Sequence, residues 1–283
     1  MINVRSVTLM AVTAMFMASV PFVSTAAAET AGEQEVTAAQ VASALSAADA
    51  RSDALVQEPV PATTDADSAA VVSQEAAAVD IPKNAADGVG ITTAGGDGLT
   101  IGIPDVAAAA DSVRLRDGTI AYPGTNGAAQ AVVPAQDGVQ MLTTITGADA
   151  PSRYAYRLSV PAGGQVRVAP DGNQATVVDG AGEVLAAVPA VWARDAQGRQ
   201  VPTHLETDGT TLTQVIDHTG GDFAYPVVAD PWWKFGLKLV KFAAKKIGPG
   251  AVAFCLVGGT WAWLRSDASG WLRVGDAVAG CLF

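Results

Sequence analysis

The chain has 283 residues, 49% of them hydrophobic, and a net charge of -11 from 17 basic and 28 acidic side chains. This acidic composition argues against binding nucleic acid through a generally basic surface. The charge is unevenly divided, because residues 232–283 carry seven basic and two acidic side chains, whereas residues 29–231 carry nine and 26. A cationic tail on an acidic body predicts that the tail contacts an anionic or apolar partner and that the body restrains it.

The first 28 residues have the pattern of a signal peptide. Arg5 gives a short positive region, an apolar run extends from Val7 to Val23, and Ala26-Ala27-Ala28 fits the small-residue cleavage rule. Glu29 is then the expected first mature residue. An uncleaved membrane anchor is the alternative, but the sequence favours an exported protein.

Residues 29–80 read as an acidic segment that is part helical and part disordered. Helical spacing of apolar residues predicts one marginal helix ending at about Val56, with Thr37 as a cap at its start. Residues 58–67 are acidic, contain Pro59 and Pro61, and lack aromatics, so they bury too little apolar surface to offset chain entropy. We therefore expect a linker over residues 57–80.

Short β-branched runs separated by turn dipeptides fill residues 81–231. Along Tyr154–Val160 apolar and polar residues alternate, as they do on a half-buried strand. An antiparallel β-sandwich or barrel of roughly 150 residues is expected, which is long enough to bury a core. A calcium-binding repeat is the weaker alternative, since only Gly95–Gly98 suggests one. Asp-Gly pairs, which favour tight hairpins, occur at Asp87, Asp97, Asp117, Asp137, Asp171, Asp179 and Asp208.

Several blocks of the chain resemble a group of secreted actinobacterial proteins. The blocks are 137–145, 150–158, 201–206, 208–218 and the sequence Tyr-Pro-Val-Val-Ala-Asp-Pro at 225–231. In that group a β-rich module ends at a similar block and is followed by a different tail. The resemblance covers residues 81–231 and implies an exported protein of Gram-positive, high-GC bacteria. It implies no activity and no site.

The tail, residues 232–283, begins with a predicted cationic amphipathic helix followed by a hydrophobic helical hairpin. Lysines spaced four, three and four residues apart form one polar stripe, and aromatic and aliphatic residues lie beside it. Such a helix suits a lipid interface, although it could equally pack on the β-module. The residues expected to contact a membrane are Trp232, Trp233, Lys234, Phe235, Leu237, Lys238, Lys241, Phe242 and Lys245.

Residues 247–264 are uncharged, which touches the lower length limit for a membrane span, but Pro249 and several glycines interrupt them. A buried or interfacial helical hairpin, 251–264 and 271–283, is the favoured interpretation. Cys255 and Cys281 are the two cysteines of the chain, and an oxidising compartment permits a disulfide between them, worth about 3–4 kcal/mol. Two buried thiols are the alternative.

Catalytic motifs are lacking in the sequence. It contains no nucleophile elbow, phosphate loop or dinucleotide fingerprint. His204, Glu206 and Asp208 would share a strand face with Asp217-His218 nearby, which leaves a mixed-ligand metal site as a weak alternative.

These patterns predict a non-enzymatic secreted protein without a cofactor, nucleic-acid partner or evident small-molecule substrate. Its acidic β-module would carry a tail that associates with an anionic membrane surface, as bacteriocin-like peptides do. The alternative is a cell-envelope binding or structural module whose tail is a disulfide-stapled subdomain. A hydrolase is the weakest reading.

Overall fold

A computed structural model describes residues 34–51, 55–73, 77–93, 96, 98–161, 163–182, 184–235, 252–257, 260–266 and 272–274 of the chain. For the last three ranges it describes the pairing of strands. The described residues are mainly β, and they fold into two large antiparallel sheets with one α-helix. Neither large sheet closes on itself, so the expected alternative of a barrel is not what forms.

The first sheet has seven strands in the order β1-β2-β3-β4-β9-β15-β14. Its two edges are β1 and β14, which come from opposite ends of the module. The bounds are β1 Ser68–Ser73, β2 Ala77–Pro82, β3 Val89–Thr93, β4 Gly98–Ile101, β9 Arg153–Ser159, β14 Thr203–Thr207 and β15 Thr211–Ile216.

The second sheet has ten strands. Eight follow the order β10-β11-β12-β17-β8-β7-β6-β5, and β16 pairs with both β8 and β13. The bounds are β5 Val113–Arg114, β6 Ile120–Tyr122, β7 Ala128–Ala135, β8 Gly138–Ile145, β10 Gln165–Val168, β11 Ala175–Val178, β12 Val184–Val188, β13 Ala193–Arg194, β16 Val227–Ala229 and β17 Trp232–Lys234.

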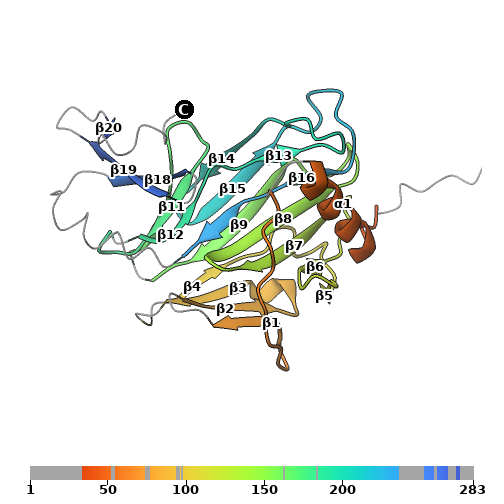
Figure 1. Cartoon of the computed structure of the whole chain (residues 1–283), viewed down its shortest axis with the longest axis horizontal. Coiled ribbons are helices and arrows are strands. Elements are labelled where there is room, and N and C mark those ends of the chain that lie inside the picture. Colours follow the sequence, from red (N-terminus) through yellow and green to blue (C-terminus); the bar gives the residue numbers. More distant parts are fainter. Residues whose placement is uncertain are drawn as a thin grey trace, which may run out of the picture. The chain divides into compact units, whose positions relative to one another are not determined.

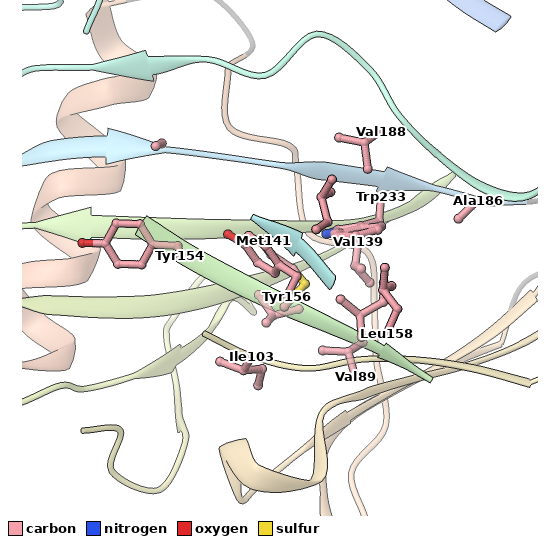
Figure 2. Packing of buried hydrophobic residues seen from close by; sticks show 14 of the residues in the cluster. Val89, Ile103, Val139, Met141, Tyr154, Tyr156, Leu158, Ala186, Val188 and Trp233 are labelled. Atoms are coloured by element: carbon pink, nitrogen blue, oxygen red, sulfur yellow. The ribbon is translucent and has the colours of Figure 1, made fainter. Parts of the chain in front are cut away.

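The two large sheets share one hydrophobic core, as in a sandwich. Figure 2 shows Tyr156 and Leu158 of β9 close to Val139 and Met141 of β8. The alternation predicted along β9 is confirmed, because Tyr154, Tyr156 and Leu158 are buried while the residues between them are exposed. Strand periodicity thus places one side of each sheet in this core.

Hairpin turns account for the Asp-Gly pairs, as the sequence predicted. Each pair lies between two consecutive strands that are antiparallel neighbours, from β2 and β3 to β14 and β15. Gly118, Gly172 and Gly209 have positive φ, the conformation that glycine adopts most readily. The Asp-Gly pairs therefore connect neighbouring strands in both large sheets.

Helix α1 (Ala38–Arg51) covers the outer side of the second sheet, against β6, β7, β8 and β16 (Figure 1). Thr37 and Gln40 form a reciprocal cap, since Gln40 N donates to Thr37 Oγ1 at 3.3 Å and Thr37 N donates to Gln40 Oε1 at 2.8 Å. The cap predicted at Thr37 is confirmed, but the helix ends at Arg51 rather than near Val56. Because α1 covers this side, β7 and β8 are buried on both faces.

The linker expected over residues 57–80 is not what the structure shows. After α1 the chain crosses the outer side of β8 and β7, where Val60 N donates to the Pro134 carbonyl at 2.8 Å. A short helical element, η1 (Ala85–Asp87), then separates β2 from β3. Residues 68–73 and 77–82 form β1 and β2 because alternate small and branched residues, including Ala70, Val72 and Val79, can bury themselves on the sheet. The prediction of a linker relied on composition and therefore missed this alternation.

The helical hairpin expected in the tail is also wrong where the chain is described. Residues 252–274 contribute three strands, β18 Val252–Val257, β19 Thr260–Ser266 and β20 Leu272–Val274, which pair in that order. Val257 pairs with Thr260, so only Gly258 and Gly259 separate the first two strands, and a Gly-Gly pair is a strong hairpin signal. Within the described part of the chain, no helix has the length and hydropathy needed to cross a bilayer.

Candidate functional site

The acidic module and the cationic tail meet along one strand of the second sheet. β16 and β17 lie end to end beside β8, with Asp230-Pro231 between them. In β17, Trp232 pairs with Gln140 and Trp233 with Val139, and Lys234 pairs with Ala187 of β12 on the other side. The Phe235 amide donates to the Asp137 carbonyl at 2.9 Å. The tail therefore starts as an interior strand of the module.

Trp233 and Phe235 lie in the core rather than at a surface that could contact lipid. Trp233 is fully buried, and its ring meets that of Tyr156 edge to face with centroids 5.9 Å apart (Figure 2). These two residues were expected in an amphipathic helix. The expectation is corrected because the backbone of residues 232–234 pairs with β8, which turns alternate side chains into the sandwich.

Trp232 and Lys234 point away from that core. Trp232 is half-buried, and the Lys234 Nζ lies 3.8 Å from the centroid of its ring, a cation–π contact. Burial lowers the pKa of Lys234, and nearby Asp137 opposes that shift. Lys234 is therefore held against the module, which leaves it little freedom to reach a headgroup.

The remaining residues of the predicted membrane set lie outside the described residues. These are Leu237, Lys238, Lys241, Phe242 and Lys245. Cys281 also lies outside, and of Cys255 the structure gives only its place in β18, so the disulfide stays a prediction.

Docking of β17 depends on Gly138. A Cβ added at Gly138 would lie 1.8 Å from the Trp233 carbonyl oxygen, far inside contact distance. We therefore expect Gly138→Ala to displace β17, to lower the free energy of unfolding by more than about 2 kcal/mol, and to speed hydrogen exchange at the Phe235 amide. Gly98→Ala is the matched control, because nothing lies within 4 Å of its added Cβ. Equal stability of the two variants would show that β17 is not docked as described.

Asp230 is a buried carboxyl group at the junction. Its side chain is 3% exposed, and Oδ1 accepts a hydrogen bond from Trp192 N at 3.0 Å while Oδ2 accepts one from Gln140 Nε2 at 3.3 Å. Burial raises the pKa of Asp230 to about 7, although both donors act in the opposite direction. Among the described residues no cation forms an ion pair with it.

Gln140 connects Asp230 to the segment that follows α1. Its Nε2 also donates to the Leu55 carbonyl at 2.8 Å, and its Oε1 accepts a hydrogen bond from Gln57 N at 2.8 Å. One amide side chain thus joins β8, the β16–β17 junction and the crossing segment. A change in the charge of Asp230 would be felt by all three elements.

The two histidines do not form a metal site. His218 is buried after β15, with Nδ1 3.0 Å from the Tyr225 hydroxyl and Nε2 3.2 Å from the Pro151 carbonyl. His204 is exposed on β14, and its neighbour Glu206 forms an ion pair with Arg153 at 2.5 Å. Among the described residues no group of three metal-binding side chains comes together. The weak metal alternative thus has no structural basis there.

An open groove of about 320 Å³ runs between α1 and the residues around Tyr225 and Asp195. Small residues of α1, Ala44, Ala47 and Ala48, form one wall. The carboxylate of Asp195 is already satisfied by hydrogen bonds, including those from the Arg199 side chain and from Ala224 N, so it offers no free ligand. The groove holds no grouping of catalytic side chains.

Sequence reasoning missed the burial of Asp230. The signal lay in the Tyr225–Pro231 block, where a single acidic residue follows a run of apolar ones. In the structure this block supplies β16, the Tyr225 contact to His218 and the Asp230 junction, so its residues have structural roles. No family model matches the chain, and no curated protein and no solved structure shows significant similarity to it.

Proposed function

We propose that the protein is an exported, non-enzymatic module that holds a cationic C-terminal tail, and that the tail associates with anionic membrane surfaces. The observation that carries the proposal is the separation of charge at one structural junction. Residues before Pro231 are strongly acidic, β17 secures the start of the tail in the sheet, and the lysine stripe follows immediately. Lipid contact then begins at Leu237, not at Trp232.

Lysine side chains of the stripe supply most of the expected attraction. Each lysine near an anionic surface contributes roughly 1 kcal/mol. Replacing Lys238, Lys241 and Lys245 together with Gln should therefore weaken binding of the full chain to anionic vesicles by roughly 100-fold. Binding should also weaken as salt shortens the Debye length, which is ~8 Å at physiological ionic strength.

Arg116, Arg157 and Arg167 provide a matched control, because they are exposed on the module and their replacement by Gln removes the same charge. Sedimentation with vesicles containing phosphatidylglycerol, and with neutral vesicles, measures the difference. Full retention of anionic binding by the triple lysine variant would refute the proposal.

The second candidate is a structural or binding module of the cell envelope, with the tail as part of its fold. The burial of Trp233 and Phe235 favours it, since the start of the tail belongs to the core. Under this proposal the wild-type chain binds neither kind of vesicle, and removal of the residues after Phe235 lowers the melting temperature of the module.

A further inference from the structure

Asp230-Pro231 is the only Asp-Pro pair in the chain. It lies where β16 ends at Ala229 and β17 begins at Trp232, which is also where the acidic part of the chain gives way to the cationic part. Cleavage of the peptide bond between Asp230 and Pro231 would therefore separate the acidic region from the cationic region.

The Asp230 carboxyl is buried and has no cationic partner among the described residues. It receives only the two N–H donors from Trp192 and Gln140. Tyr156 of β9 is the titratable group whose pKa responds to Asp230. Such surroundings favour the neutral acid, because burial penalises the charged carboxylate more than the two N–H donors stabilise it.

We propose that Asp230-Pro231 is a self-cleavage site, at which the Asp230 carboxyl breaks the peptide bond that follows it and so separates the acidic module from the cationic tail. The proposal does not depend on the membrane role of the tail. It gives the buried carboxyl a chemical role in addition to its structural hydrogen bonds.

The reaction needs only Asp230, Pro231 and water. A side-chain oxygen of Asp230 attacks the carbonyl carbon of the same residue and forms a five-membered cyclic anhydride. The bond from that carbon to the Pro231 nitrogen breaks, and the proton of the carboxylic acid moves to that nitrogen, which leaves as a secondary amine. Water then opens the anhydride, which leaves Asp230 with its side-chain carboxyl and a new terminal carboxyl. No oxidation or reduction occurs.

Two features of the site favour this step. The attacking carboxyl and the carbonyl belong to one residue, so their effective concentration is high. Pro231 is linked through a tertiary amide, whose nitrogen carries no hydrogen and is occupied by no hydrogen bond, while its own carbonyl accepts one from Met141 N at 2.9 Å. Because β17 stays paired with β8, the cut tail remains bound until the strand leaves the sheet.

The direct test is incubation of the full-length protein at about pH 5.5 and about pH 8.5, followed by mass spectrometry under denaturing conditions. With the pKa of Asp230 at about 7, the neutral acid changes about 30-fold over this interval, and a fragment beginning at Pro231 should form about 30-fold faster at the lower pH. In concentrated urea at about pH 5.5 the carboxyl regains its ordinary pKa of 3.8, so cleavage should almost stop.

Two variants identify the reacting groups. Asp230→Asn removes the acid, and Pro231→Ala keeps the acid but replaces the tertiary amide, so both should lose the fragment at least tenfold. Asp195→Asn is the control, because Asp195 is equally buried but is followed by Ala196, and it should cleave like the wild type.

A wild-type chain that stays intact at both pH values overturns the proposal and makes Asp230 purely structural. The same fragment formed at the wild-type rate from Asp230→Asn also overturns it, because the reaction would then not need the Asp230 carboxyl. The pH series and the urea comparison use the wild type alone, so they remain decisive if a variant fails to fold. Vesicle binding enters none of these measurements, so this proposal and the membrane proposal fail separately.

Discussion

The wild-type chain is expected to lose stability steeply as the pH rises from about 4 to about 7. Replacing Asp230 with Asn is expected to abolish this pH dependence. The pKa of Asp230 is about 7 in the folded chain against 3.8 when exposed, so in this window the folded state holds a proton that the unfolded state has lost. The free energy of unfolding therefore falls as pH rises, by about 1.4 kcal/mol per pH unit. The contribution is complete at low pH, and its loss, on the order of 4 kcal/mol, is complete above pH 7.

Urea unfolding of the intact chain at several pH values measures this slope. Asp195→Asn should keep it, because hydrogen bonds from Ala224, Arg199 and Gln197 lower the pKa of Asp195 against its burial, and its titration falls below the window. Glu206 and Asp208 also have lowered pKa values and act in the same acidic range. A wild-type slope unchanged by Asp230→Asn would mean that this carboxyl is ionised in the fold.

Replacing Trp233 with Ala is expected to cost about 3–5 kcal/mol of stability, the usual range for removing a large aromatic ring from a packed core. Trp233 is fully buried, and it would leave a cavity beside Tyr156 and Val139. A loss of this size is a large fraction of the stability of an ordinary domain. The change should appear in the urea midpoint and in the melting temperature.

Trp232→Ala is the matched control, since Trp232 is the neighbouring residue and only half-buried, and it should cost less than about 2 kcal/mol. The pair also tests where lipid contact begins. A Trp233→Ala variant that keeps full stability but loses vesicle binding would return this residue to the membrane surface, against the position it has in β17.

The sequence predicted the sandwich because local rules agreed with one another over residues 81–231. Asp-Gly turns set the hairpins, and alternation along β9 and β15 set the buried faces. The prediction failed at Trp232–Phe235, where aromatic residues and lysines fit a helix and a strand equally well. Only the pairing with β8, contributed by residues about 90 positions earlier, decides between them.

The burial of Asp230 could not be predicted from the local sequence pattern for the same reason. A lone aspartate beside a proline predicts a turn, and its burial follows from Trp192, Gln140 and Tyr156, which come from distant parts of the chain. The strands β1 and β2 were missed because small residues such as Ala70 and Ala77 carry little hydrophobic signal, although both are buried in the fold.

Strand β8 pairs along one edge with β7, its immediate predecessor in a hairpin, and along the other with β16 and β17. The first pairing forms as soon as the hairpin exists, whereas the second waits until the ribosome has made residue 234. Until then one edge of β8 is open, and contacts so distant along the chain form slowly. A nascent chain therefore cannot complete the second sheet until β17 has been made.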